Sequence, residues 1–262
     1  MATQTSPDGF AFRINKVIHA SVGDAAYPLD MRDVIAEFAP AYAPGVTVSV
    51  SSRRMDAVDG ALIASTDRKN FSILTNSDVA STGRKNFTIA HEFGHFLCHR
   101  NLGREFWCSR DVLNGLSVDE VEAQANRFAS QILLPNHFVR AVADGSEFSL
   151  DAVRDLARRT GSSVTAAALA CVNLSSKPIG FAVMRDGFVR WGRASEKAYS
   201  MGLYFKAGSS PPAGSAADFE SFPTDQIFDS GAKIAGWSAD SDWRESGFYS
   251  ARYEEAYFAF RQ

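Results

Sequence analysis

The segment NFTIAHEFGHFLCHR, residues 86–100, constrains the structure of this chain more than any other part of the sequence. Its apolar residues recur at helical spacing, so we predict a helix that lies in a hydrophobic core. His91 and His95 are four residues apart, and such residues face the same way on a helix, with Cβ atoms about 5–6 Å apart. Both side chains can therefore point an imidazole nitrogen at one metal ion.

Glu92 follows the first of these histidines, so its side chain is rotated by one helix position. Its carboxylate would lie beside the ion without binding it, which is the H-E-x-x-H arrangement of two ligands and a general base. A metal ion lowers the pKa of a bound water to about 7, and the glutamate removes the proton. The alternative is an ordinary buried helix. Gly94 favours the metal site, because glycine costs a helix about 1 kcal/mol relative to alanine and suits a close approach of another backbone.

A catalytic zinc ion normally has three protein ligands, and the helical pattern of residues 117–134 offers three acids as candidates for the third. Ser117 and Glu120 have the spacing of a capping box, which gives Glu120 a structural role. Asp119 suits the dipole of the first helical turn. Glu122 lies beside the apolar stripe without a local partner, and we predict it as the third ligand. A solvent-facing helix acid would have the same spacing.

Two further residues are predicted to support the metal ligands. Asn126 lies one turn after Glu122 on the same helix face, where its side chain would hold a ligating histidine through the second ring nitrogen. His99 follows His95 by four residues, so it faces the same side of the helix. It either supports the site, contacts the substrate or is a structural histidine at the end of the helix. Two histidines and a glutamate suit Zn²⁺, the predicted cofactor, with Mn²⁺ as the alternative.

The order of the remaining patterns predicts an α+β protein in three parts, 1–140, 141–176 and 177–262. Short β-type runs (VTVSVSS, GALIAST and FSILTN) precede the histidine helix, and STDRKN reads as a hairpin turn between the last two. The segment of residues 28–42 has helical spacing, and we expect this helix to end at Pro40. Residues 149–172 read as helix, glycine turn, helix, and β-type segments dominate after a boundary at Ser175–Pro178.

Charge and composition argue against several classes of function. The net charge of −3 argues against a general nucleic-acid binder, and the second helix of residues 149–172 has no basic or amide side chain to read a base edge. We therefore expect no direct DNA binding. No apolar run approaches the roughly 20 residues that span a bilayer, and we find no secretion signal. The scattered Cys98, Cys108 and Cys171 fit a reducing cytoplasm, either as small hydrophobic residues or, for the first two, as a redox switch.

The motifs RKNFTIAHEFGHFLCH and EAQANRFASQILLP together resemble the ImmA/IrrE family of metallopeptidases. That family shows an F-T-x-A-H-E-x-G-H helix followed by an E-x-x-A-N-x-F-A-x-x-L-L-x-P helix, which match residues 87–95 and 122–135. The resemblance implies a zincin-like peptidase domain with a short antiparallel sheet, a helix-turn-helix-like segment and a β-rich C-terminal domain. It supports His91, His95 and Glu122 as metal ligands and Glu92 as the base. Gln131 and Ile132 depart mildly from the family pattern.

The resemblance also implies a cytoplasmic endopeptidase whose substrate is a transcriptional repressor with a helix-turn-helix (HTH) domain. Cleavage would derepress stress, DNA-damage or mobile-element genes. The alternative is an anti-repressor that binds and sequesters the repressor without cutting it. By analogy with related zinc peptidases, FSILTN, residues 71–76, would be the edge strand that pairs with the substrate chain. The tryptophans of residues 177–262 predict an aromatic β core, with a small-molecule sensor domain as the alternative.

Overall fold

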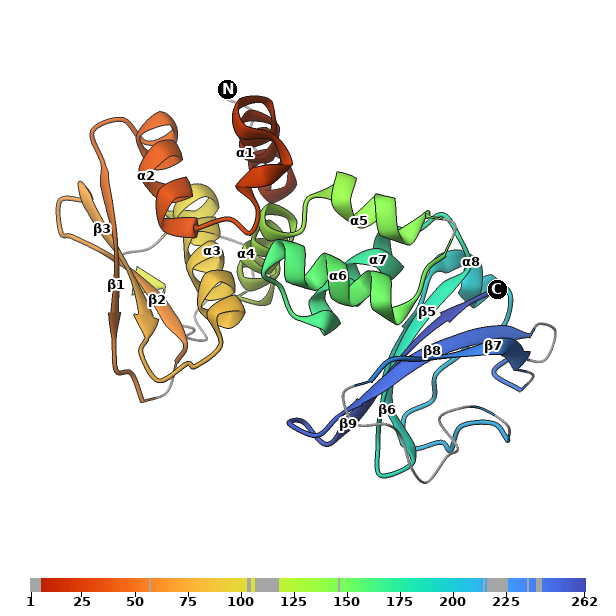
Figure 1. Cartoon of the computed structure of the whole chain (residues 1–262). Helices are drawn as coiled ribbons and strands as arrows, with labels where there is room; N and C mark the ends of the chain where they lie inside the picture. Colours follow the sequence, from red (N-terminus) through yellow and green to blue (C-terminus); the bar gives the residue numbers. More distant parts are fainter. Residues whose placement is uncertain are drawn as a thin grey trace. The chain divides into compact units, whose positions relative to one another are not determined.

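The computed structural model describes residues 6–56, 58–102, 105–106, 118–145, 147–213, 215, 226–234, 236–238 and 242–262. Cys108 and Ser117, on which two predictions rest, lie outside these residues. The chain divides into two compact units, one of Met1–Pro135 with Arg159–Ser163 and one of Asn136–Arg158 with Val164–Gln262. Each unit contains helices and one sheet (Figure 1), which confirms the predicted α+β class. The predicted three-part division stays a prediction.

The first unit contains the helices α1 (Pro7–Val22), η1 (Gly23–Ala26), α2 (Met31–Tyr42), α3 (Thr82–His99) and α4 (Val118–Leu133). Pro40 does not stop α2 but lies inside its last turn, which corrects the prediction. A proline there removes one helical hydrogen bond close to where the helix would end anyway. The Arg100 guanidinium donates a hydrogen bond to the Tyr42 carbonyl over 3.1 Å, which satisfies one of the last acceptors of α2.

The first sheet consists of β1 (Thr47–Arg53), β2 (Gly60–Ala64), β3 (Asn70–Asn76) and β4 (Glu105–Phe106), in the order β1-β3-β2-β4. The predicted hairpin of β2 and β3 is confirmed. The sheet is mixed rather than antiparallel, because β1 pairs with β3 in parallel. The FSILTN segment lies in β3, which is paired on both sides, so the prediction that it forms an edge is wrong. Among the described strands, the edges are β1 and β4.

Helices α2 and α3 cover the same face of this sheet, and α4 packs against the side of α3 that faces away from it (Figure 1). An aromatic core joins these layers. Phe96 of α3 meets Phe71 of β3 at 5.1 Å between ring centroids, and Phe93 of α3 meets Phe128 of α4 at 5.9 Å. Helix α3 is therefore held between the sheet and α4.

The second unit contains α5 (Asn136–Ala143), most of α6 (Leu150–Thr160), α7 (Val164–Leu174) and α8 (Glu196–Ser200). Its antiparallel sheet has the order β6-β5-β9-β8-β7, formed by β5 (Ile179–Arg185), β6 (Phe188–Ala194), β7 (Phe228–Ile234), β8 (Trp243–Ser250) and β9 (Glu255–Arg261). Gly161, with φ +67°, separates α6 from α7 as predicted. Within the described residues, no helix is both long and apolar enough to cross a membrane.

One buried carboxylate lies in the aromatic core of this second unit. Glu245 of β8 is only 1% exposed, close to the buried Trp237, Trp243 and Phe260. The Ser215 hydroxyl lies 2.9 and 3.0 Å from its two oxygens, and the Trp237 indole N–H donates to one of them. Both carboxylate oxygens therefore have hydrogen-bond partners, as buried charges require.

Candidate metal centre

The two helices that build the site begin and end for local reasons. The Ser81 hydroxyl accepts a hydrogen bond from the Arg84 N–H and caps the start of α3. At the other end, the Arg100 guanidinium donates to the carbonyls of Phe96 and Leu97 over 3.2 and 3.0 Å. These groups satisfy backbone atoms that a helix leaves unpaired at its termini. The histidines thus sit on a helix whose ends are both fixed.

Helices α3 and α4 touch at backbone distance beside the histidines. A Cβ atom added to Gly94 would lie 3.1 Å from a ring carbon of Phe128 and 3.2 Å from the Ala125 Cα. Any larger residue at position 94 would push the helices apart. The close approach that the sequence predicted at this glycine is therefore made by α4.

The structure brings His91, His95 and Glu122 together, with one candidate ligand atom of each lying within 4.8 Å of the others. The two histidine Nε2 atoms are 3.0 Å apart. The Glu122 carboxylate lies 3.2 Å from the Nε2 of His91 and 3.3 Å from that of His95. Side-chain exposure is 12% for His91, 2% for His95 and 28% for Glu122, so solvent reaches the cluster from the Glu122 side.

Hydrogen bonds fix the far side of both imidazoles, directly from α4 for His91 and through His99 for His95. The Asn126 Oδ1 lies 3.0 Å from the Nδ1 of His91 and accepts its proton. The Nδ1 of His95 lies 3.1 Å from the Nδ1 of His99, whose Nε2 lies 3.1 Å from Gln124 Oε1. Helical spacing did not point to Gln124, because it lies on a different face of α4 from Glu122.

The Glu92 carboxylate lies close to Gly60 of β2. It is 5% exposed, and its Oε2 atom has no hydrogen-bond partner among the described residues. Gly60 of β2 leaves the room that this side chain needs, since a Cβ atom there would lie 3.0 Å from Glu92 Oε1 and 2.3 Å from Thr88 Cγ2. Gly60 was not predicted as part of the site, although a glycine in a strand pattern signals a close approach.

Burial and mutual contact set the proton affinities of the site. Burial raises the pKa of Glu92 to about 7. Burial lowers the pKa of His95, against the opposing effect of Glu122. Burial also lowers the pKa of His91, but the contacts with Glu122 and Glu92 have a larger effect, so the pKa is raised overall. Contacts with His91 and His95 hold the pKa of Glu122 far below its usual range. Burial lowers the pKa of His99 to about 4, which keeps that ring neutral.

The donor set fits a metal ion. With Asn126 accepting the Nδ1 proton of His91, the Nε2 of that ring is the atom left to bind an ion, in place of the proton that it shares with Glu122. A carboxylate of low proton affinity faces the same point. Two imidazole nitrogens and one carboxylate are ligands that zinc accepts, and three protein ligands are typical of a catalytic site.

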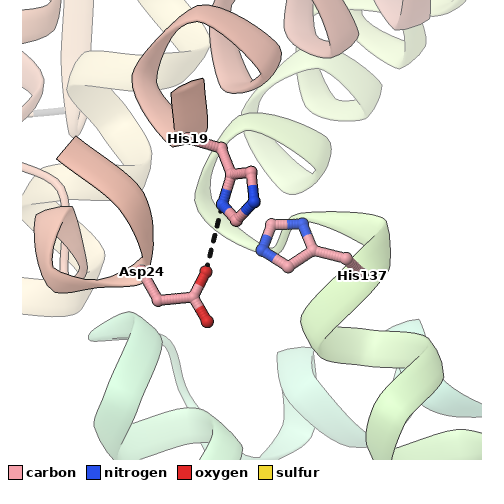
Figure 2. Close-up of side chains that lie close together, drawn as sticks. All are labelled: His19, Asp24 and His137. Carbon is pink, nitrogen blue, oxygen red and sulfur yellow. Dashed lines mark ion pairs between the residues drawn. The ribbon is translucent and has the colours of Figure 1, made fainter. Parts of the chain in front are cut away.

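Other polar residues that the sequence singled out lie outside the cluster. Asp119 and Glu120 are exposed on the first turn of α4. Burial raises the pKa of the Cys98 thiol to about 12, which disfavours the thiolate that a redox switch needs. Figure 2 draws the exposed ion pair of the first unit between His19 Nδ1 and Asp24 Oδ1, at 3.2 Å. It also labels His137, which stands in the first turn of α5 in the second unit.

Residues 46–171, which include α3 and α4, match the Peptidase_M78 family model, described as the IrrE N-terminal-like domain. This match shows that the chain contains a metallopeptidase domain of the ImmA/IrrE type. A metallopeptidase domain implies a metal ion, and the described residues supply the cluster of His91, His95 and Glu122 that could hold one.

A solved structure described as a Mycobacterium tuberculosis transcriptional regulator shares the fold of this chain. The two chains are 16% identical with a TM-score of 0.52, and the alignment covers 98% of this chain and 75% of the other. At this level of identity the likeness concerns the fold alone. No curated protein matches the chain.

Proposed function

We propose that this protein is a cytoplasmic, metal-dependent endopeptidase that cleaves an HTH-family transcriptional repressor. The observation that carries the proposal is the meeting of His91, His95 and Glu122 next to a buried glutamate, Glu92. The family match supports the peptidase activity. The first 140 residues would form the zincin-like peptidase domain, 141–176 the HTH-like segment and 177–262 the β-rich domain.

His91, His95 and Glu122 would hold the ion, in the two-histidine, one-glutamate set of a gluzincin-like site. Zn²⁺ is the proposed ion, because it accepts mixed nitrogen and oxygen ligands, and Mn²⁺ is the alternative. When bound, such an ion activates water and polarises a scissile carbonyl as a Lewis acid. Asn126 supports this role from behind, since it accepts the Nδ1 proton of His91 and so orients the ring.

Glu92 would move the protons of the reaction. A pKa of about 7, raised by burial, matches the requirement that a general base accept a proton near neutral pH and release it again. Glu92 would take a proton from the attacking water and give one to the leaving amine. Its unpartnered Oε2 leaves a lone pair for this purpose. The acid packs against Gly60 of β2, which limits the positions its carboxylate can take.

The proposed substrate is a repressor whose loss derepresses stress, DNA-damage or mobile-element genes. The family resemblance supports this assignment, and the transcriptional regulator with the same fold is compatible with it. The alternative is a non-proteolytic anti-repressor that sequesters the repressor. A buried, unpartnered glutamate beside the ligands favours catalysis, because a metal that only holds the fold needs no base.

The test is cleavage of the HTH repressor encoded nearest to this gene. Purified protein would be incubated with the repressor and Zn²⁺ or Mn²⁺, in parallel with Glu92→Gln and with a chelated sample. We expect one specific cut that both controls abolish, and the metal that restores the chelated sample identifies the cofactor.

Two other results would change the assignment. A stable complex with the repressor that forms without any cut, and forms equally with Glu92→Gln, would favour the sequestering anti-repressor. A cut that survives chelation and the Glu92→Gln change would contradict the metallopeptidase mechanism. Glu120→Gln, an exposed acid on α4, serves as the matched control.

A further inference from the structure

On α3, the proposed ligand His95 contacts His99 one turn further on. His99 in turn contacts Gln124 of α4. We propose that Gln124 is a positioning residue for His95, acting through His99 to keep the His95 proton on Nδ1 and its Nε2 lone pair toward His91 and Glu122. The inference rests on the proposed function in that the same three residues are taken as the metal ligands.

The row of groups is continuous and protected from solvent. His95 and His99 are each 1% exposed, and their Nδ1 atoms lie 3.1 Å apart. The Nε2 of His99 lies 3.1 Å from the Oε1 of Gln124, which is half-buried. Burial matters here, because water cannot easily replace a missing partner and a wrong tautomer would leave polar atoms unpaired.

The chemistry of the amide sets the direction of each bond. An amide oxygen only accepts hydrogen bonds, so the Nε2 of His99 must carry a proton. A neutral imidazole has one N–H, and the Nδ1 of His99 is then an acceptor. The contact between the two Nδ1 atoms consequently needs the proton of His95 on its Nδ1. This leaves the Nε2 of His95 as a lone-pair donor, which is the form that a metal ion requires.

The opposite tautomer shows what Gln124 prevents. If His99 carried its proton on Nδ1, that proton would point at His95 and drive the His95 proton onto Nε2. The His91 Nε2 and Glu122 carboxylate, 3.0 and 3.3 Å away, would then hold this proton, and an ion would have to displace it. His91 avoids the problem directly through Asn126, whereas His95 depends on a relay of two residues.

The test uses Gln124→Met, which keeps the length of the side chain and removes the acceptor. Gln131→Met is the matched control, because Gln131 is a half-buried glutamine of the same helix whose backbone carbonyl, not its side chain, bonds Asn15. One measurement is the ¹⁵N chemical shift of the histidine ring nitrogens in metal-free, full-length protein at pH 8. The other is the Zn²⁺ affinity, by competition with a chromogenic chelator.

In wild type and Gln131→Met we expect the proton of His95 on Nδ1 and that of His99 on Nε2. In Gln124→Met we expect His95 to populate the Nε2-protonated form and Zn²⁺ to bind about tenfold more weakly. Wild-type His95 with its proton on Nε2, or a Gln124→Met variant with unchanged ring shifts, would overturn the proposal. If His91→Ala leaves Zn²⁺ affinity unchanged, the metal site and the proposed function fail, whereas the tautomers of the metal-free protein still decide the role of Gln124.

Discussion

Each unit buries glutamate side chains, and Glu92 of the first unit and Glu245 of the second have opposite surroundings. Glu245 in the second unit is 1% exposed, with both carboxylate oxygens bonded by Ser215 and Trp237. Glu92 in the first unit is 5% exposed, with one oxygen that has no partner among the described residues. A buried charge costs free energy unless it is hydrogen-bonded. Glu245 therefore stabilises the fold, whereas the unsatisfied Glu92 lowers its stability when ionised, as expected of the proposed general base.

The largest expected effect is on catalysis by Glu92. Loss of a general acid–base residue typically lowers the rate by about 10²–10⁴-fold, so we predict a fall of this size in kcat for Glu92→Gln. Zn²⁺ affinity should stay close to wild type, because Glu92 is not among the three ligands. Single-turnover cleavage and chelator competition measure the two quantities. If Glu92→Gln and Glu120→Gln lowered kcat equally, the buried acid would have no special role compared with an exposed one.

The second prediction concerns the free energy of unfolding of the metal-free protein. The pKa of Glu92 is raised in the fold from 4.5 to about 7, so its contribution to stability is present below pH 4.5 and is lost as the pH rises through 7. Glu92→Gln removes this pH dependence. We therefore expect the variant to be more stable than wild type at pH 8 by roughly 3 kcal/mol, and equally stable near pH 4.

Urea unfolding in the presence of a chelator, followed by circular dichroism at both pH values, measures this difference. A variant that is less stable than wild type at pH 8 would show that Glu92 is bound by partners in solution. In that case it would resemble Glu245, and the contrast between the two residues would disappear.

The third prediction concerns Glu245, whose replacement should lower the free energy of unfolding instead of raising it. Glu245→Leu removes the carboxylate that accepts from the Trp237 indole N–H, and an unsatisfied buried donor costs about 1–3 kcal/mol. We expect the second unit to lose about 2 kcal/mol, measured by tryptophan fluorescence during unfolding. Glu147→Leu, an exposed acid of the same unit, is the control. Zn²⁺ affinity should be unchanged in both variants.

The smallest expected effect tests how firmly β2 holds Glu92. The Cβ atom of Gly60→Ala would collide with Thr88 Cγ2 and press on Glu92 Oε1. A shifted base should lower kcat about tenfold while Zn²⁺ affinity is retained. Thr88→Ser removes the colliding methyl and keeps the hydroxyl that donates to the Arg84 carbonyl, so the double variant should recover activity. No recovery would mean that Gly60 acts on something other than this contact.

Local periodicity accounts for the parts of the site that the sequence predicted. His91 and His95, and likewise Glu122 and Asn126, are spaced by one helical turn, and the structure gathers all four. Gln124 and Gly60 were missed for a shared physical reason. Each contacts the site through packing between elements, which helical or strand spacing does not encode. For Gly60 the glycine itself was a usable signal, whereas nothing in the spacing marks Gln124.

The fold shows the same division between local and tertiary information. Strong amphipathic patterns and the turn at residues 65–70 predicted α2, α3, α4 and the β2–β3 hairpin. The position of β3 inside the sheet was not predictable, because strand order depends on where the parallel β1 pairs. Helix α1 was missed although Ser6 caps it and Pro7 opens it. Its buried side consists of few residues, among them Ala11 and Ile14, so the apolar stripe is weak.

The contact between Gly94 and Ala125 has a consequence for how the protein takes up its ion. Because the backbones of the two helices lie so close that a Cβ atom on Gly94 would come within 3.2 Å of the Ala125 Cα, their packing sets the spacing of the proposed ligands before any metal arrives. Such a preformed site differs from a zinc finger, in which the ion drives folding. We expect chelation to abolish activity without unfolding the first unit, and reloading to restore it. The protein would then respond to the supply of metal reversibly, as an enzyme that is loaded and unloaded while it remains folded.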